Sequence, residues 1–175
     1  IVPGLRWVVE PSGVRVVEAD ALPVDWRALL GDDEWTLVAN LPYNVATPLV
    51  ADLLDDVPQI TRMLVMVQRE VGERLAAHVG DEGYGAVSVK VAFWARAEIV
   101  GRVPPTVFLP KPKVESALVR IVRRASPAVA GVDPAWLFSV GRAGFGHRRK
   151  LLRVALAGVA TVAQPVPAGI APTAA

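Results

Sequence analysis

The sequence predicts an α/β fold, in which helices cover a sheet, followed by a small helical domain. The apolar run Trp35 to Ala39 has the length of a buried strand, and Pro42 cannot continue it. Met63 to Val67 is a second such run, and a helical pattern follows it from about Glu70 to His78. Strands that alternate with helices in this way are typical of a sheet with helices on its faces.

The first half of the chain contains three predicted strands. Val14 to Glu18 is rich in valine and indicates a strand that ends at Asp20. The runs 35–39 and 63–67 are the second and third strands. Between them, the spacing of apolar residues predicts an amphipathic helix over Ala46 to Asp55. Its inward face would be formed by Leu49, Val50, Leu53 and Leu54.

The second half of the chain begins with a predicted loop, Gly80 to Gly85, and a predicted helix, Ala86 to Ala95. Two further strands are expected, Ile99 to Val103 and Ala117 to Val122. The segment between these strands is predicted to be a loop because prolines interrupt it. These prolines are Pro104, Pro105, Pro110 and Pro112.

A linker is predicted at Ala125 to Ala128, where small residues surround a proline. It divides the chain into a first domain over residues 1–124 and a second over residues 125–175. In the second domain we expect two helices, Pro134 to Phe145 and Arg148 to Ala160.

Charge is distributed unevenly along the chain. Residues 1–100 hold 8 Lys and Arg against 15 Asp and Glu, whereas residues 101–175 hold 11 against 2. The balances of −7 and +9 give the net charge of +2. A basic half of this kind suits a polyanionic partner, although a solvated helix face is an open alternative. The densest cluster consists of Arg148, Arg149, Lys150 and Arg153.

The composition indicates a soluble globular protein, with 53% hydrophobic and 21% charged residues. The absence of cysteine excludes disulfides and thiolate metal sites and suits the cytoplasm. The uncharged tail from Val154 to Ala175 contains Pro165, Pro167 and Gly169, which argue against a membrane-spanning helix. We therefore expect a cytoplasmic protein without a membrane segment or a metal site.

The tetrapeptide Asn40-Leu41-Pro42-Tyr43 is the most informative motif. It follows a predicted strand directly, and open α/β sheets bind ligands at the carboxyl ends of their strands. Asn40 and the Leu41 carbonyl are two neighbouring hydrogen-bond acceptors, and Tyr43 adds an aromatic face. This combination suits the exocyclic amino group of a flipped base. The alternative is a strand-ending turn, with Asn40 as a helix cap and Tyr43 as a packing residue.

Five segments in the same order resemble motifs of the ribosomal RNA adenine dimethyltransferases. They are Val38 to Val50, Met66 to Val71 with Arg74-Leu75, Tyr84-Gly85 with Ser88-Val89, Val103 to Ser116, and Phe145 to Lys150. The bacterial small-subunit (16S) enzymes are more similar than the antibiotic-resistance methylases of large-subunit RNA. The segments Gln68 to Val71 and Gly83 to Gly85 favour the former. An enzyme of the resistance class remains the nearest alternative.

This resemblance implies a fold and an activity. It implies a partial Rossmann-like class I methyltransferase sheet and a partial C-terminal RNA-binding domain. The activity would be N6-dimethylation of adenine in 16S ribosomal RNA, with S-adenosylmethionine as cosubstrate. The partner would be the small ribosomal subunit during ribosome biogenesis, and we expect a monomer.

The resemblance also implies roles for individual residues. The catalytic residues would be Asn40, Leu41, Pro42, Tyr43 and Phe108; the cosubstrate-binding residues Asp20, Ala21 and Asn40; and the RNA-binding residues Lys111, Lys113, Arg148, Arg149, Lys150 and Arg153. Two alternatives stay open, because Asp20 could initiate a turn and Phe108 could belong to the core.

One part of the family pattern is missing. No G-x-G-x-x-G follows any predicted strand, and Ile1 to Leu5 resembles the family's glycine-rich turn only faintly. The end at Ala168 to Ala175 resembles a family segment that stops early. We therefore expect a chain that lacks about two strands and the last helices and is inactive alone. A non-catalytic RNA-binding module is the alternative from a different class.

Overall fold

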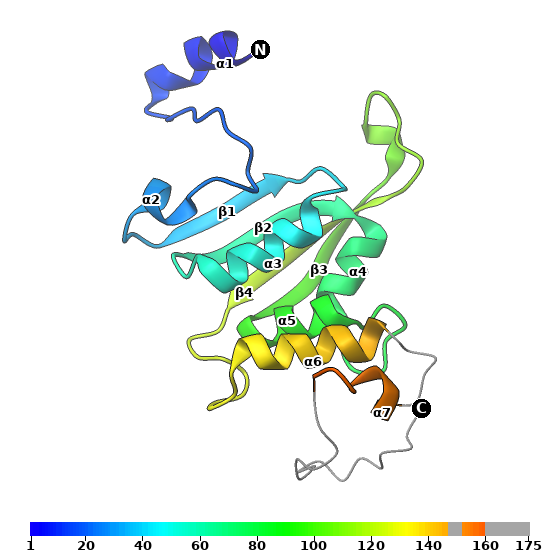
Figure 1. Cartoon of the computed structure of the whole chain (residues 1–175). Helices are drawn as coiled ribbons and strands as arrows, with labels where there is room; N and C mark the ends of the chain where they lie inside the picture. Colours follow the sequence, from blue (N-terminus) through cyan, green and yellow to red (C-terminus); the bar gives the residue numbers. More distant parts are fainter. Residues whose placement is uncertain (147–151, 160–175) are drawn as a thin grey trace.

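The computed structural model describes residues 1–146 and 152–159. Its centre is a four-stranded sheet, and helices pack on one face of it (Figure 1). The strands are β1 (Trp35–Asn40), β2 (Ile60–Gln68), β3 (Ala95–Val103) and β4 (Ser116–Arg123). The α-helices are α1 (Val2–Val9), α2 (Trp26–Leu30), α3 (Ala46–Asp56), α4 (Arg69–Ala76), α5 (Ala86–Trp94), α6 (Pro134–Gly146) and α7 (Leu152–Ala155). Two short 3₁₀ helices are η1 (Glu10–Ser12) and η2 (Pro105–Val107).

The order of the strands is β1-β2-β4-β3. β1 runs parallel to β2, whereas β4 is antiparallel to both β2 and β3. The carboxyl ends of β1, β2 and β3 therefore meet the amino end of β4 at one edge of the sheet. In the register, Asn40 pairs with Met66, and Ser116 pairs with both Gln68 and Val103.

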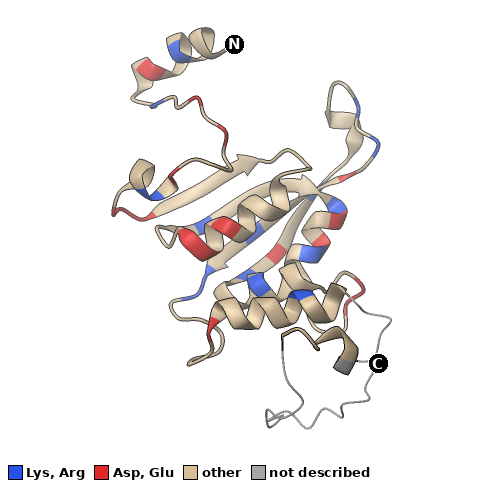
Figure 2. Cartoon of the chain, viewed as in Figure 1, with Lys and Arg blue, Asp and Glu red and all other residues tan. Residues whose placement is uncertain are grey.

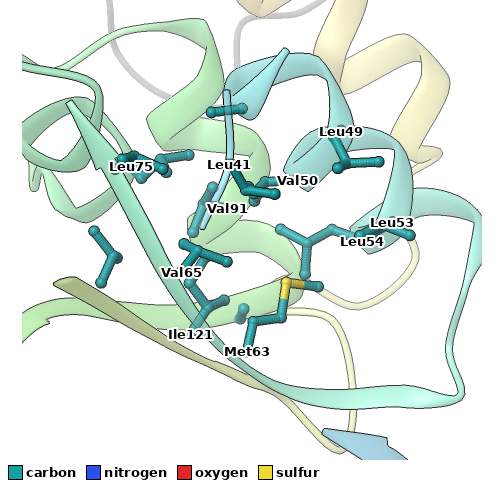
Figure 3. Packing of buried hydrophobic residues seen from close by; sticks show 14 of the residues in the cluster. Leu41, Leu49, Val50, Leu53, Leu54, Met63, Val65, Leu75, Val91 and Ile121 are labelled. Carbon is teal, nitrogen blue, oxygen red and sulfur yellow. The ribbon is translucent and has the colours of Figure 1, made fainter. Parts of the chain in front are cut away.

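The hydrophobic core lies between the sheet and the helices α3, α4 and α5 (Figure 3). The predicted apolar face of α3 is confirmed, because Leu49, Val50, Leu53 and Leu54 are all buried. β2 contributes every second residue, namely Met63, Val65 and Val67. The intervening residues of β2 and β4 face the opposite side of the sheet and are partly or fully exposed.

Gly72 lets α4 approach the sheet closely. A Cβ atom at this position would lie 3.0 Å from the Ala117 Cβ and 3.1 Å from the Val119 Cγ2. These distances are shorter than ordinary van der Waals contact. The glycine therefore sets the separation of α4 from β4, and α4 starts directly at the carboxyl end of β2.

Arg123 ties the end of β4 to the end of α3. Its guanidinium donates hydrogen bonds to the carbonyls of Leu53, Leu54, Val57 and Ile60 at distances of 2.9 to 3.1 Å. The carbonyls at the carboxyl end of a helix have no partner within the helix, and a cation there also complements the helix dipole. Partial burial lowers the pKa of Arg123, and the nearby Asp55 opposes that shift.

An ion pair ties α5 to α3, and contacts of an aromatic ring tie α5 to α6. Lys90 lies 2.5 Å from the Asp55 carboxylate, which also accepts a 2.7 Å hydrogen bond from the Trp94 indole. The Lys90 Nζ lies 4.9 Å from the centre of the Phe138 ring, and Phe138 packs edge-on against Phe93. The helical segment after the linker thus rests on the sheet domain, and the division at residue 124 remains a prediction.

Most predicted elements are present within a few residues of their expected bounds, but the strand at Val14 to Glu18 is wrong. These residues form no sheet pairing, although they are rich in valine. A strand needs a neighbour for its backbone groups, and β-propensity alone does not provide one. The preceding helix α1 and the short helix α2 were not predicted.

The last predicted helix, Arg148 to Ala160, is described only in part. α7 covers Leu152–Ala155, and residues 156–159 form a turn, so the helix ends earlier than expected. Residues 147–151 and 160–175 lie outside the described part. Within the described residues, no helix has the length and apolar character needed to cross a membrane.

Candidate functional site

The Asn40–Tyr43 motif forms a fixed turn between β1 and α3. The Leu41 side chain is only 6% exposed, and its N–H donates a 3.1 Å hydrogen bond to the Met66 carbonyl. The Pro42 carbonyl accepts hydrogen bonds of 3.1 Å from the N–H groups of Val45 and Ala46, where α3 begins. A buried side chain and three backbone hydrogen bonds therefore hold the turn at the sheet edge.

Two acceptors in this turn have no hydrogen-bond partner among the described residues. The side chain of Asn40 is exposed, and no hydrogen bond within the described residues uses its amide or the Leu41 carbonyl. Asn40 does not cap α3 either, because the cap position is Val45 and no side chain bonds there. The capping alternative for Asn40 is therefore not what the structure contains.

Tyr43 is held by its hydroxyl group. The Tyr43 hydroxyl lies 3.2 Å from the Oγ atom of Ser116, the first residue of β4. Ser116 is buried, whereas Tyr43 remains 36% exposed. One end of the tyrosine is thus anchored to the sheet while part of the side chain is accessible from solvent. Packing and ligand contact are both compatible with this arrangement.

The proline-rich loop, residues 104–115, rises from the same sheet edge. It connects β3 to β4 and projects beyond the sheet (Figure 1). Its base is tied to α4, because the Arg69 N–H donates a 2.9 Å hydrogen bond to the Glu115 carbonyl and the two side chains form a 3.1 Å ion pair. Phe108 is half-buried, and Lys111 and Lys113 are exposed.

Asp20 and Ala21 belong to the irregular segment before α2. The Asp20 carboxylate accepts a 3.0 Å hydrogen bond from the Leu22 N–H, which is the turn-initiating arrangement. Its second oxygen takes part in no hydrogen bond of the described residues. Ala21 packs against the core, and its carbonyl accepts a 3.0 Å hydrogen bond from the Trp26 indole. Asp20 is exposed, so one carboxylate oxygen is available to a ligand.

The predicted basic cluster lies mostly outside the described residues. Arg148, Arg149 and Lys150 are among residues 147–151, and the backbone of Arg153 lies in α7 without a described side chain. Figure 2 shows acidic and basic residues side by side along α4. They form ion pairs along the helix surface, with Arg69 close to Glu73 and Arg74 close to Glu70.

One cavity lies away from the described residues of the predicted site. It has a volume of about 590 Å³ between α4, the loop after residue 80 and the end of α6. Acidic side chains from Glu70, Glu73 and Glu82 line it, together with Arg74 and Phe145. None of the predicted site residues that the structure describes lines this cavity. In the described part of the chain, no group of three or more His, Cys, Asp or Glu could hold a metal ion.

Ser116 and Glu115 were missed from the sequence as residues that support the site. Ser116 holds the Tyr43 hydroxyl, and Glu115 fixes the loop base to Arg69. Both residues lie at the end of the segment Val103 to Ser116, in which only the prolines, Phe108 and the lysines were considered. Their proximity to the motif depends on the pairing of β4 with β2, which no local pattern in the sequence indicates.

The sequence matches the ribosomal RNA adenine dimethylase family over residues 7–168. The relative from Acidothermus cellulolyticus, named ribosomal RNA small subunit methyltransferase A, is 49% identical over 163 residues, which cover 90% of this chain and 55% of the relative. The Streptomyces coelicolor protein of the same name is 46% identical over 164 residues, which cover 91% of this chain and 57% of the relative. The chain therefore spans about half the length of these relatives.

Two solved structures have a similar fold. A dimethyladenosine transferase from Plasmodium falciparum matches with a TM-score of 0.74 and 25% identity over 89% of this chain and 55% of that one. The 23S rRNA methyltransferase ErmE matches with a TM-score of 0.67 and 24% identity over 89% of this chain and 61% of that one. The described sheet and helices thus have the class I methyltransferase fold, as the sequence predicted.

Proposed function

Since the chain belongs to the ribosomal RNA adenine dimethylase family, we propose that it forms the target-base half of an enzyme that dimethylates the N6 atom of adenine in small-subunit (16S) ribosomal RNA. One observation carries this proposal. The Asn40 side chain and the Leu41 carbonyl are acceptors without a hydrogen-bond partner among the described residues, and they lie beside Tyr43, whose hydroxyl contacts Ser116. The names of the similar proteins from Acidothermus and Streptomyces support the small subunit as the substrate.

The turn would act on the exocyclic nitrogen of adenine. The lone pair of this nitrogen is delocalised into the ring, which makes the nitrogen a poor nucleophile. Hydrogen bonds from its two N–H groups to the Asn40 side chain and the Leu41 carbonyl favour a pyramidal nitrogen with a localised lone pair. Three backbone hydrogen bonds fix the main chain of the turn, including the Leu41 carbonyl, and positioning of this kind supplies much of the rate.

Tyr43 and Phe108 would hold the plane of the adenine. Stacking on an aromatic side chain contributes about 1–3 kcal/mol per base. The hydrogen bond to Ser116 fixes one end of Tyr43, so little conformational freedom is lost when the base binds. Phe108 comes from the loop that rises at the same edge and would provide a second apolar contact.

The residues assigned to the cosubstrate fit S-adenosylmethionine by their chemistry. The free oxygen of Asp20 can accept a hydrogen bond from the adenine amino group of the cosubstrate, and the Ala21 N–H can donate one. Asn40 lies at the end of β1, where the two substrates would meet. When bound, the cosubstrate supplies a methyl group on a sulfonium. Because Asp20 and Asn40 are exposed, they would contact the cosubstrate without enclosing it.

RNA would contact the basic side chains. Lys111 and Lys113 are exposed on the loop beside the site and suit phosphate contacts. Arg148, Arg149, Lys150 and Arg153 would add a second contact area in the helical segment. We further propose that the enzyme acts as a monomer in the cytoplasm, where it meets the small ribosomal subunit.

A chimeric enzyme tests this function. The part of this chain that aligns with the Acidothermus relative, with 49% identity over 163 residues, would replace the matching segment of that relative. Transfer of labelled methyl groups to small and large ribosomal subunits would then be compared, and the modified nucleoside identified by mass spectrometry. We expect N6,N6-dimethyladenosine in the small subunit. A folded chimera that methylates neither subunit, or only the large one, would contradict the proposal.

A further inference from the structure

The tip of the loop 104–115 presents two large apolar side chains to solvent. Leu109 is 100% exposed, and Val107 is 63% exposed. Phe108, which lies between them, is half-buried. Single exposed leucines are common on protein surfaces, so this exposure alone decides nothing. Two further observations, the charge of the loop and its position beside the Asn40–Tyr43 turn, indicate what the exposed side chains could contact.

The loop is basic around this apolar tip. From Gly101 to Val114 the chain holds Arg102, Lys111 and Lys113 and neither Asp nor Glu. All three cations are exposed. Figure 2 shows the basic residues on the outer part of the loop and the acidic residue only where the loop rejoins the sheet. That residue is Glu115, and it is paired with Arg69. An apolar tip flanked by cations that form no ion pair with the described residues fits a nucleic acid better than a membrane or an acidic protein groove.

The loop is anchored beside the proposed base-binding turn. Val103, the last residue of β3, pairs with Ser116, and Ser116 holds the Tyr43 hydroxyl at 3.2 Å. The Arg69 N–H fixes the loop base at Glu115. The tip therefore projects from the same sheet edge as Asn40 and Tyr43, and its position relative to them is set by strand pairing.

We propose that Leu109 is a positioning residue that enters the stack of the RNA when the target adenine leaves it. This inference rests on the proposed function, because it needs a flipped base at Asn40 and Tyr43. Extruding a base leaves a gap and loses its stacking with both neighbours. Proteins that unstack nucleic acids commonly insert apolar wedges such as leucine at the disturbed step. Lys111 and Lys113 would hold the flanking phosphates while Leu109 fills the gap.

The test uses the 175-residue chain and short RNA hairpins, each with 2-aminopurine next to one adenosine, so that the adenosine keeps its 6-amino group. The fluorescence of 2-aminopurine rises when the neighbouring adenine leaves the stack, and the anisotropy of an end-labelled hairpin reports binding separately. We expect the wild-type chain to bind and to raise the fluorescence of at least one hairpin. Leu109→Ala should lower the flipped population by about tenfold, which corresponds to about 1.4 kcal/mol. Its affinity for the hairpin should change by less than about threefold, because the phosphate contacts remain.

Three further variants make the result specific. Leu109→Met keeps a wedge of similar volume and should retain the fluorescence rise. Val79→Ala removes another strongly exposed apolar side chain, in the loop after α4, and should behave as wild type. Tyr43→Ala should abolish the rise, because it removes the stacking surface for the flipped base.

Each outcome decides the proposal. Loss of the rise in Leu109→Ala with binding retained supports the wedge. A full fluorescence rise in Leu109→Ala overturns the role proposed for Leu109. If Tyr43→Ala loses the fluorescence rise in the same experiment, the proposed base-binding function stands without a role for Leu109. A wild-type chain that raises the fluorescence of no hairpin, or that binds none, overturns both. Equal losses in Leu109→Ala and Leu109→Met would overturn the wedge, because volume would then not matter.

Discussion

The turn at Asn40–Tyr43 and the N-terminal segment of residues 1–34 both carry predicted ligand residues, but they are held very differently. The turn has a buried leucine, three backbone hydrogen bonds and the contact from Tyr43 to Ser116. By contrast, α1 has no buried residue, and residues 14–18 belong to no strand. The comparison teaches that the turn proposed to hold the target base is fixed by several contacts, whereas α1 and residues 14–18 add neither a buried residue nor a strand to the described fold.

The largest expected effect concerns S-adenosylmethionine. Because Asp20 and Asn40 are exposed, we expect the isolated chain to bind the cosubstrate with a dissociation constant of about 1 mM or weaker. Isothermal titration calorimetry would measure this, with S-adenosylhomocysteine as a second ligand. Micromolar binding, abolished by Asp20→Ala, would show that the cosubstrate side is complete and that the two regions do not differ as described.

Arg123 tests the well-held region. Arg123→Met removes hydrogen bonds to three carbonyls at the end of α3 and to the Ile60 carbonyl of β2, and we expect a loss of about 2–4 kcal/mol in the free energy of unfolding. Arg120→Met is the matched control, since Arg120 pairs with Glu98 on the exposed face of the sheet. That change should cost about 0–1 kcal/mol. Urea denaturation would measure both, and equal losses would refute the role given to Arg123.

The hydrogen bond between Tyr43 and Ser116 tests how the turn is fixed. Ser116→Ala and Tyr43→Phe each remove one partner of this 3.2 Å contact, and each should lower stability by about 0.5–1.5 kcal/mol. In the double variant the losses should not add, because the two groups share one interaction. Thermal unfolding of the four proteins would provide the comparison. Fully additive losses would mean that the two groups do not interact.

The smallest effect is expected in α1. Trp7 is strongly exposed, so Trp7→Ala should change the free energy of unfolding by no more than about 0.5 kcal/mol. Trp26 is the matched control, because it packs against the core and its indole donates to the Ala21 carbonyl. Trp26→Ala should cost about 2–4 kcal/mol. Urea denaturation would measure both variants. A large loss at Trp7 would show that α1 packs on the rest of the chain.

The sequence predicted the parts of the fold whose pattern depends on local burial. The spacing of Leu49, Val50, Leu53 and Leu54 predicted α3 correctly, because one face of that helix lies on the sheet. The same reasoning failed at Val14 to Glu18, because a strand exists only with a partner, and a run of valines does not show one. The helix α2 was missed, although its first turn carries a capping residue. The Asp25 side chain accepts a hydrogen bond from the Ala28 N–H, as an N-cap does.

The candidate site was predictable in part. Pro42 cannot continue a strand, and this predicted that Asn40 and Leu41 lie at the carboxyl end of one. The structure confirms the prediction, because β1 ends at Asn40. The contact from Tyr43 to Ser116 joins residues 73 positions apart, and only the pairing of β2 with β4 brings them together. The roles of Asp20, Ala21, Phe108 and the basic cluster remain predictions.

The most direct test of the central claim is the amide of Asn40. In the chimera with the Acidothermus relative, Asn40→Ala should lower the rate of methyl transfer by about 10²–10³-fold, because it removes one preorganised acceptor at the reacting nitrogen. Asn44→Ala removes an exposed amide from the same turn and should retain activity within about threefold, while both variants bind RNA as the unmodified chimera does. Methyl transfer by Asn40→Ala at the rate of Asn44→Ala would contradict the claim that this turn holds the target adenine.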